Sequence, residues 1–70
     1  MFMQPVSSSD IRAIGYDADT STLKVAFHSG GVYQYWGVPV SVHRALISAS
    51  SKGRYLHAYI KNRYPGNRAG

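Results

Sequence analysis

The chain has 70 residues, a hydrophobic content of 44%, a net charge of +5 and no cysteine. This length allows one domain near the lower limit of independent folding, where about 60% of the surface of the unfolded chain becomes buried. The lack of cysteine excludes disulfides and thiolate metal sites, and no apolar run approaches the roughly 20 residues of a transmembrane helix. We therefore expect a soluble cytoplasmic protein with no membrane association, stabilised by packing alone.

Charged residues are unevenly distributed along the chain. All three acids, Asp10, Asp17 and Asp19, precede residue 20, whereas every basic residue except Arg12 follows it. The surface formed by the later residues should therefore be uniformly positive and attract polyanions such as nucleic acid. The alternative interpretation is that the basic charge serves solubility alone.

Both ends of the chain lack the periodicity of regular structure. Residues 1–8 are rich in serine, and residues 65–70 contain proline and two glycines, which interrupt helices and strands. We expect two flexible tails on either side of one domain at residues 9–64.

Three strands are predicted in succession inside this domain. Residues 11–16 combine β-branched and aromatic side chains, and the polar residues 17–21 predict a turn. Apolar and polar side chains alternate over residues 23–28, which is typical of a strand with one buried face. The glycines within residues 29–31 suit a tight hairpin, and residues 32–36 form an aromatic strand.

Two helices are predicted after the strands. Pro39 suits the start of a helix, where a missing N–H costs nothing, and apolar residues then recur at helical spacing at Val42, Ala45, Leu46 and Ala49. Ser50 or Ser51 can cap a second helix, whose apolar stripe consists of Tyr55, Leu56, Tyr59 and Ile60. The predicted fold is α+β: a three-stranded antiparallel β-meander followed by two helices packed on one face of the sheet.

Several short motifs follow one another in the order of a known family. They are Ile14-Gly15-Tyr16-Asp17, Leu23-Lys24-Val25-Ala26-Phe27, Gly31-Val32-Tyr33-Gln34-Tyr35, Val38-Pro39 and Ala49-Ser50-Ser51-Lys52-Gly53-Arg54-Tyr55, running on to Ile60 and Tyr64. On these residues the chain resembles the KTSC domain, a short module found at the C-terminus of some lysyl-tRNA synthetases and as a stand-alone bacterial protein. The resemblance covers nearly the whole chain and implies this small α+β fold. The family's association with a tRNA enzyme implies RNA binding.

Tyr33 and Tyr35 lie two residues apart on a strand, so both point to the same face of the sheet, and the hairpin register decides which face that is. A three-residue loop at 29–31 places Tyr33 opposite Phe27 and Tyr35 opposite Val25, on the buried face. A two-residue loop instead exposes both tyrosines on the open face. There they would form a platform for nucleic-acid bases, each contributing about 1–3 kcal/mol.

The choice of register also decides which other aromatic residue is available for binding. The two-residue loop buries Gln34 without an evident hydrogen-bond partner, at a cost of about 1–3 kcal/mol, so we favour the buried tyrosine pair. In that register Trp36 lies on the open face with Lys24 and His28 and offers a smaller stacking platform.

A second candidate binding site lies at the predicted start of the second helix. Unpaired N–H groups and the positive end of the helix dipole favour an anion there. Hydroxyls, a close-approach glycine and two cations would surround a phosphate, and the residues concerned are Ser51, Lys52, Gly53 and Arg54. Arg44, Lys61 and Arg63 could extend this surface along a nucleic-acid backbone. The alternative is an ordinary serine cap with solvated basic side chains.

Metal sites and catalysis find little support in the sequence. Asp17 and Asp19 resemble the start of a calcium loop, but Thr22 and His28 occupy its glycine and glutamate positions. The three histidines lie on different predicted elements without metal-ligand spacing. With no cysteine and no glutamate, few groups remain for acid, base or nucleophilic catalysis. We expect a non-enzyme with no metal and no cofactor.

Two functional hypotheses therefore remain. The first is a nucleic-acid-binding module, with RNA preferred, that acts through phosphate contacts and aromatic stacking. The second is a protein-interaction module, monomeric or weakly dimeric, whose exposed Trp36 and helix surfaces bind an acidic partner or a second copy. Phosphate-dominated binding should weaken steeply with salt, whereas an apolar interface should not.

Overall fold

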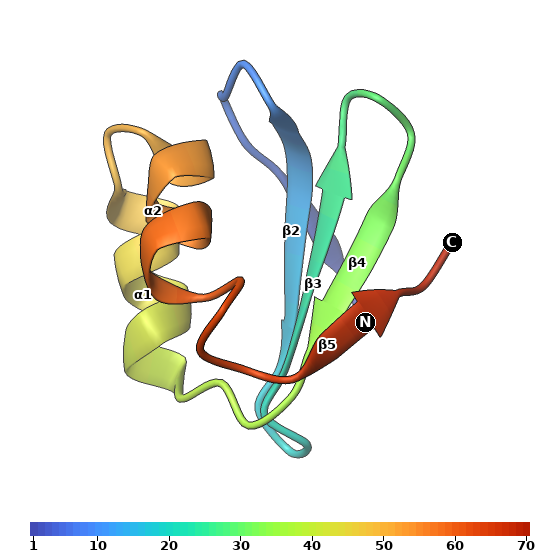
Figure 1. Cartoon of the computed structure of the whole chain (residues 1–70), viewed down its shortest axis with the longest axis vertical. Coiled ribbons are helices and arrows are strands. Elements are labelled where there is room, and N and C mark those ends of the chain that lie inside the picture. Colours follow the sequence, from blue (N-terminus) through green and yellow to red (C-terminus); the bar gives the residue numbers. More distant parts are fainter.

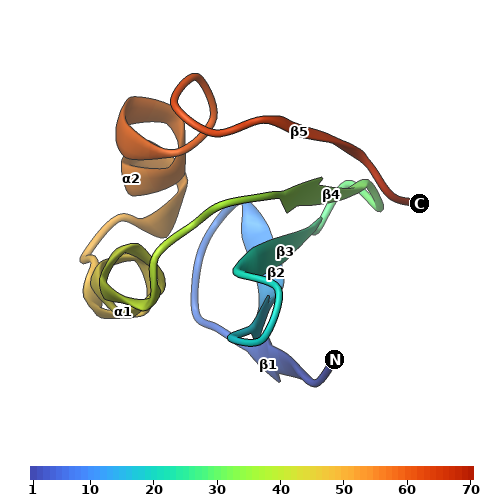
Figure 2. The ribbon, with the colours of Figure 1, turned by 90° about the horizontal axis from the view of Figure 1, so that it is seen from below.

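The computed structural model describes all 70 residues and shows an α+β fold. Along the chain the elements are β1 (Met3–Pro5), β2 (Ile11–Asp17), β3 (Thr22–Phe27), β4 (Val32–Tyr35), α1 (Val40–Ser48), α2 (Lys52–Tyr59) and β5 (Gly66–Arg68). All five strands join one antiparallel sheet in sequence order, and both helices lie on the same side of it (Figure 1, Figure 2). Neither helix has the length and apolar character needed to cross a membrane.

The α+β class and the two helices are as predicted, but a three-stranded sheet is an underestimate. The segments expected as tails, residues 1–8 and 65–70, each contribute an edge strand: β1 pairs with β2, and β5 pairs with β4, where Arg68 lies opposite Tyr33. These strands have three residues each, and most of their side chains are exposed. Because backbone pairing and not side-chain burial holds these strands in the sheet, their residues show no alternation of apolar and polar side chains from which the sequence could predict them.

The hairpin between β3 and β4 has a register that the sequence did not predict. Gly30, with φ of 104°, takes the left-handed position of the turn, and the Phe27 N–H donates to the Gly31 carbonyl at 2.9 Å. Tyr33 therefore lies opposite Val25 rather than opposite Phe27. The shift amounts to two residues, and because side chains alternate with period two it leaves both tyrosines on the predicted, helix-covered face.

The helices begin where the sequence predicts, and their apolar stripes face the sheet. Pro39 precedes α1 and Ser51 precedes α2, although the Ser51 side chain forms no capping hydrogen bond. Residues from both layers form one core, namely Ile11, Ile14, Leu23, Val25, Tyr35, Val38, Leu46, Leu56 and Ile60. Tyr59, which the stripe of the second helix included, is 52% exposed at the end of α2.

Candidate nucleic-acid interface

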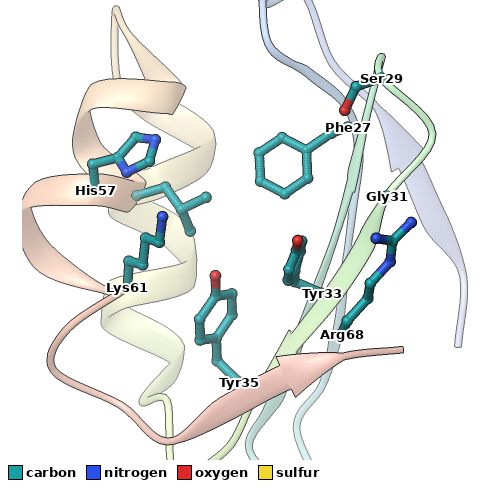
Figure 3. Close-up of a pocket in the computed structure, with 9 residues that line it drawn as sticks. Phe27, Ser29, Gly31, Tyr33, Tyr35, His57, Lys61 and Arg68 are labelled. Carbon is teal, nitrogen blue, oxygen red and sulfur yellow. The ribbon is translucent and has the colours of Figure 1, made fainter. Parts of the chain in front are cut away.

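A groove of about 480 Å³ lies between α2 and the part of the sheet formed by β3, β4 and β5 (Figure 3). Aromatic side chains from the sheet form one wall, and Leu56 of α2 lies across from them. Three basic side chains reach the same space from α2, from the turn that follows it and from β5. We call this space the basic groove, and the side chains that define it are Phe27, Tyr33, Tyr35, His57, Lys61 and Arg68.

The basic side chains are brought together by the path of the chain after α2. His57 lies on α2, and Lys61 follows the helix end, where its N–H donates to the Leu56 carbonyl at 2.8 Å. The chain then crosses to the sheet as β5, which places Arg68 beside β4 (Figure 2). Arg68 donates from Nε to the backbone oxygen of Gly70, the last residue of the sequence, at 3.2 Å, and this bond does not use its two terminal guanidinium nitrogens.

The aromatic wall combines a ring pair with two hydroxyl groups. Phe27 and Tyr33 pack edge to face, with ring centroids 5.6 Å apart. Tyr35 is only 6% exposed, and burial, followed by the nearby Tyr33, raises the pKa of its phenol. Both tyrosine hydroxyls point into the basic groove (Figure 3). The hydroxyl of Tyr16 does not face the groove in this way, because it donates a hydrogen bond of 2.5 Å to the Val38 carbonyl.

The electrostatic character of the basic groove follows from where the acids lie. No carboxylate is among the residues that line it. Asp17 and Asp19 lie at the turn between β2 and β3, and Asp10 lies in an adjoining cleft that shares Phe27 and His57 with the groove. Lys61 and Arg68 therefore line the groove without an Asp or Glu side chain beside them, and the Asp10 side chain lies in the cleft beyond Phe27.

The predicted anion site at the start of α2 has a different environment from the one expected. Lys52 donates from Nζ to the Ala49 carbonyl at 3.1 Å, so its ammonium group joins the two helices. Gly53 is buried, and a Cβ there would lie 2.9 Å from Asp10 Oδ2. Since the chain's own carboxylate lies against this helix start, a phosphate would meet a like charge. Ser51 and Arg54 are exposed, and a role for these four residues in binding stays a prediction.

The other predicted residues are spread over the surface. Arg44 and Arg63 are exposed on α1 and after α2. Lys24 pairs with Gln34 and therefore points to the sheet face opposite Tyr33 and Tyr35. Trp36 is 36% exposed just after β4. Of the predicted binding residues, the structure brings Tyr33, Tyr35 and Lys61 together, and it leaves Lys24 on the far face.

Three residues of the basic groove, Phe27, His57 and Arg68, were absent from the predicted site. Arg68 lies in the segment expected to be a tail, and nothing in its neighbours Asn67 and Ala69 predicts a strand. His57 was considered as one of three histidines without metal-ligand spacing, and not as a binding residue. The length of the linker after α2 could have suggested a return to the sheet, but the pairing of β5 with β4 is a tertiary event.

Comparisons with known proteins agree with the resemblance drawn from the motifs. The family model described as KTSC domain matches residues 7–64. A crystal structure of a KTSC domain protein from Yersinia pestis has 45% sequence identity and a TM-score of 0.94, and the match covers 99% of this chain and 97% of that one. The matched family range ends before β5, whereas the structural match includes nearly the whole chain.

Sequence relatives are of two lengths. A protein from Tsukamurella paurometabola is 42% identical over 62 residues, which are 89% of this chain and 92% of that protein. A lysine–tRNA ligase from Nostoc sp. is 43% identical over 56 residues, which are 80% of this chain. The match spans only 10% of the length of that ligase. The similarity to the ligases thus concerns one small module of a much longer protein.

Proposed function

The chain belongs to the KTSC domain family, and from this premise we propose that it is a small RNA-binding module. The observation that carries the proposal is the convergence of His57, Lys61 and Arg68 on a groove that no Asp or Glu side chain lines. The relatives named lysine–tRNA ligase make RNA the preferred polyanion, since a module joined to such an enzyme is close to a tRNA.

The chemistry of the basic groove suits a nucleotide. Lysine and arginine bind phosphate oxygens by charge-assisted hydrogen bonds, and arginine can do so with two parallel N–H groups. Aromatic rings beside them can stack on bases, each stack contributing about 1–3 kcal/mol. Phe27 and Tyr33 are half-buried and lie in the groove wall, so they combine with the cations in one site.

Salt dependence provides a quantitative test. Two phosphate contacts, from Lys61 and Arg68, predict a slope of about −1.4 in a plot of log affinity against log salt for single-stranded RNA. Exposed Arg54 and Arg63 would steepen the slope if they also contact the backbone. Fluorescence anisotropy with a labelled single-stranded RNA, a tRNA and a duplex DNA at two salt concentrations measures it.

A matched pair of variants completes the test. Lys61→Gln removes a charge from the basic groove, whereas Arg12→Gln removes the same charge from an exposed position on β2. We expect Lys61→Gln to weaken RNA binding and to reduce the salt slope by about 0.7, and Arg12→Gln to change neither. Absence of binding to every nucleic acid at low salt would refute the proposed function.

A second candidate function, binding of an acidic protein or of another copy, has one observation in its favour. Trp36, Val40 and Tyr59 are 36%, 45% and 52% exposed, and large exposed apolar side chains are enriched at interfaces. A complex held by these apolar side chains would depend weakly on salt. Analytical ultracentrifugation of the chain alone, compared with Trp36→Ala, separates self-association from RNA binding.

A further inference from the structure

We propose that the basic groove is a binding site for one nucleotide that carries a phosphomonoester group, either free or at the end of an RNA strand. Lys61 and Arg68 hold the phosphate, and Phe27 and Tyr33 contact the base. This inference deepens the proposed function and rests on it for taking the ligand to be a nucleotide. It adds that the groove binds a phosphomonoester group and not the phosphodiester of a strand interior.

The first support is the shape of the groove. α2 forms one side and the sheet forms the other (Figure 3). The volume of about 480 Å³ falls within the range of about 300–1,000 Å³ that is usual for small-molecule sites, which suits a single nucleotide.

The second support is the amount of positive charge. A phosphomonoester carries a charge of about −1.5 to −2 at neutral pH, whereas each phosphodiester of a strand interior carries one negative charge. Lys61 and Arg68 approach the groove from the helix side and the sheet side, with no carboxylate among the lining residues (Figure 3). Tyr33 and Tyr35 add two hydroxyl donors between them. This donor set matches a terminal phosphate with three free oxygens.

The third support is the orientation of the nucleotide that the surrounding charges favour. Beyond Phe27 and His57 the groove meets a polar cleft that contains Ser9, Asp10 and His28. The Asp10 carboxylate repels a phosphate from that end, so the phosphate belongs at Lys61 and Arg68. The base then extends towards Phe27, where polar groups of the cleft can pair with its edge.

The probes are uridine 5′-monophosphate, uridine and inorganic phosphate, measured by isothermal titration calorimetry. Two charge-assisted contacts predict that the monophosphate binds at least about tenfold more tightly than uridine. Lys61→Gln and Arg68→Gln should each remove about tenfold of this affinity, and Arg12→Gln should remove none. Since Arg68 also lies in β5, Lys61→Gln serves as the variant that leaves the strand pairing intact. Equal binding of uridine and its monophosphate would overturn the proposal.

RNA oligomers distinguish the two sources of the phosphate. An eight-nucleotide RNA is compared with a 5′-phosphate, with a 3′-phosphate and with neither. Tighter binding of one phosphorylated form, lost in Lys61→Gln, supports a strand end. Binding of the monophosphate but of no RNA supports a free nucleotide and refutes the proposed function. Equal binding of all three oligomers, weakened alike by Lys61→Gln and Arg12→Gln, overturns the groove site while RNA binding stands.

Discussion

Tyr35 allows folding and binding to be separated experimentally, because its ring belongs to the core and its hydroxyl faces the basic groove. The residue is 6% exposed and lies opposite Leu23. Tyr35→Phe keeps the ring and removes only the hydroxyl. We expect the free energy of unfolding to change by less than about 1 kcal/mol, because the ring stays in the core and the hydroxyl that is removed faces the basic groove.

Tyr35→Ala provides the contrast. Deleting a buried aromatic ring costs about 3–5 kcal/mol. A domain of this size has a total stability of about 3.5–10 kcal/mol, at about 0.05–0.15 kcal/mol per residue. The alanine variant should therefore be largely unfolded or close to it, and only the phenylalanine variant is suitable for binding experiments.

The binding arm uses uridine 5′-monophosphate. Loss of one hydrogen bond to a charged phosphate, about 1.5 kcal/mol, corresponds to about a tenfold loss of affinity. Urea denaturation measures stability and calorimetry measures affinity on the same samples. Tyr35→Phe should lose affinity and keep its stability. A loss of more than about 2 kcal/mol of stability with unchanged affinity would show that the hydroxyl serves the fold.

The phenol also provides a spectroscopic readout. Burial, and then the charge of Tyr33, raises the pKa of Tyr35 above its ordinary value of 10.0. A bound phosphate adds negative charge nearby and should raise this pKa further. The absorbance of tyrosinate during an alkaline titration should show a late step that shifts upwards with uridine 5′-monophosphate and disappears in Tyr35→Phe. A late step that persists in the variant would contradict the assignment.

Other residues give further predictions. The His43 ring stacks on the Tyr16 ring, with centroids 4.7 Å apart, and burial, followed by the charge of Arg44, lowers the pKa of His43 below 6.5. As the pH falls below about 6.5, the unfolded chain binds a proton at His43 before the folded chain does, so the free energy of unfolding decreases. Urea denaturation at pH 7.5 and 5 should show a smaller loss for His43→Phe than for the wild type, and equal losses would refute this origin. Gly53→Ala should change stability by no more than about 1 kcal/mol, because the exposed carboxylate in its way can rotate aside while helix propensity improves; Gly53→Leu should destabilise the fold clearly in the same assay. Lys24→Gln, on the far sheet face, should leave nucleotide affinity unchanged in calorimetry.

Much of the fold was predictable because local patterns and the core agree. The alternation in β3 and the apolar stripes of the helices follow from which side chains are buried, and Pro39 and Ser51 mark where the helices start. The edge strands were not predictable on this basis. Gly66, Asn67 and Arg68 bury no side chain, so their place in the sheet depends only on backbone pairing with β4.

The candidate site was also predicted only in part. The sequence indicated the basic surface and Tyr33, Tyr35 and Lys61 as residues of interest, and its first-choice register buried the tyrosines on the correct face while naming the wrong partners. It placed the anion site at the start of α2 because serines, a glycine and two cations adjoin there. In the structure Asp10 approaches that glycine, a contact across 43 positions of the chain that no local motif encodes.

The sequence by itself determined the family, the two helices, the inner strands and the excess of positive charge, since each follows from residue type and short-range spacing. Only the tertiary structure decided that Arg68 returns to the sheet opposite Tyr33, and that Arg68 and Lys61 line one groove. The physical reason is that a binding site depends on the positions of side chains in space. Those positions are determined by strand pairing and helix packing between residues far apart in the chain.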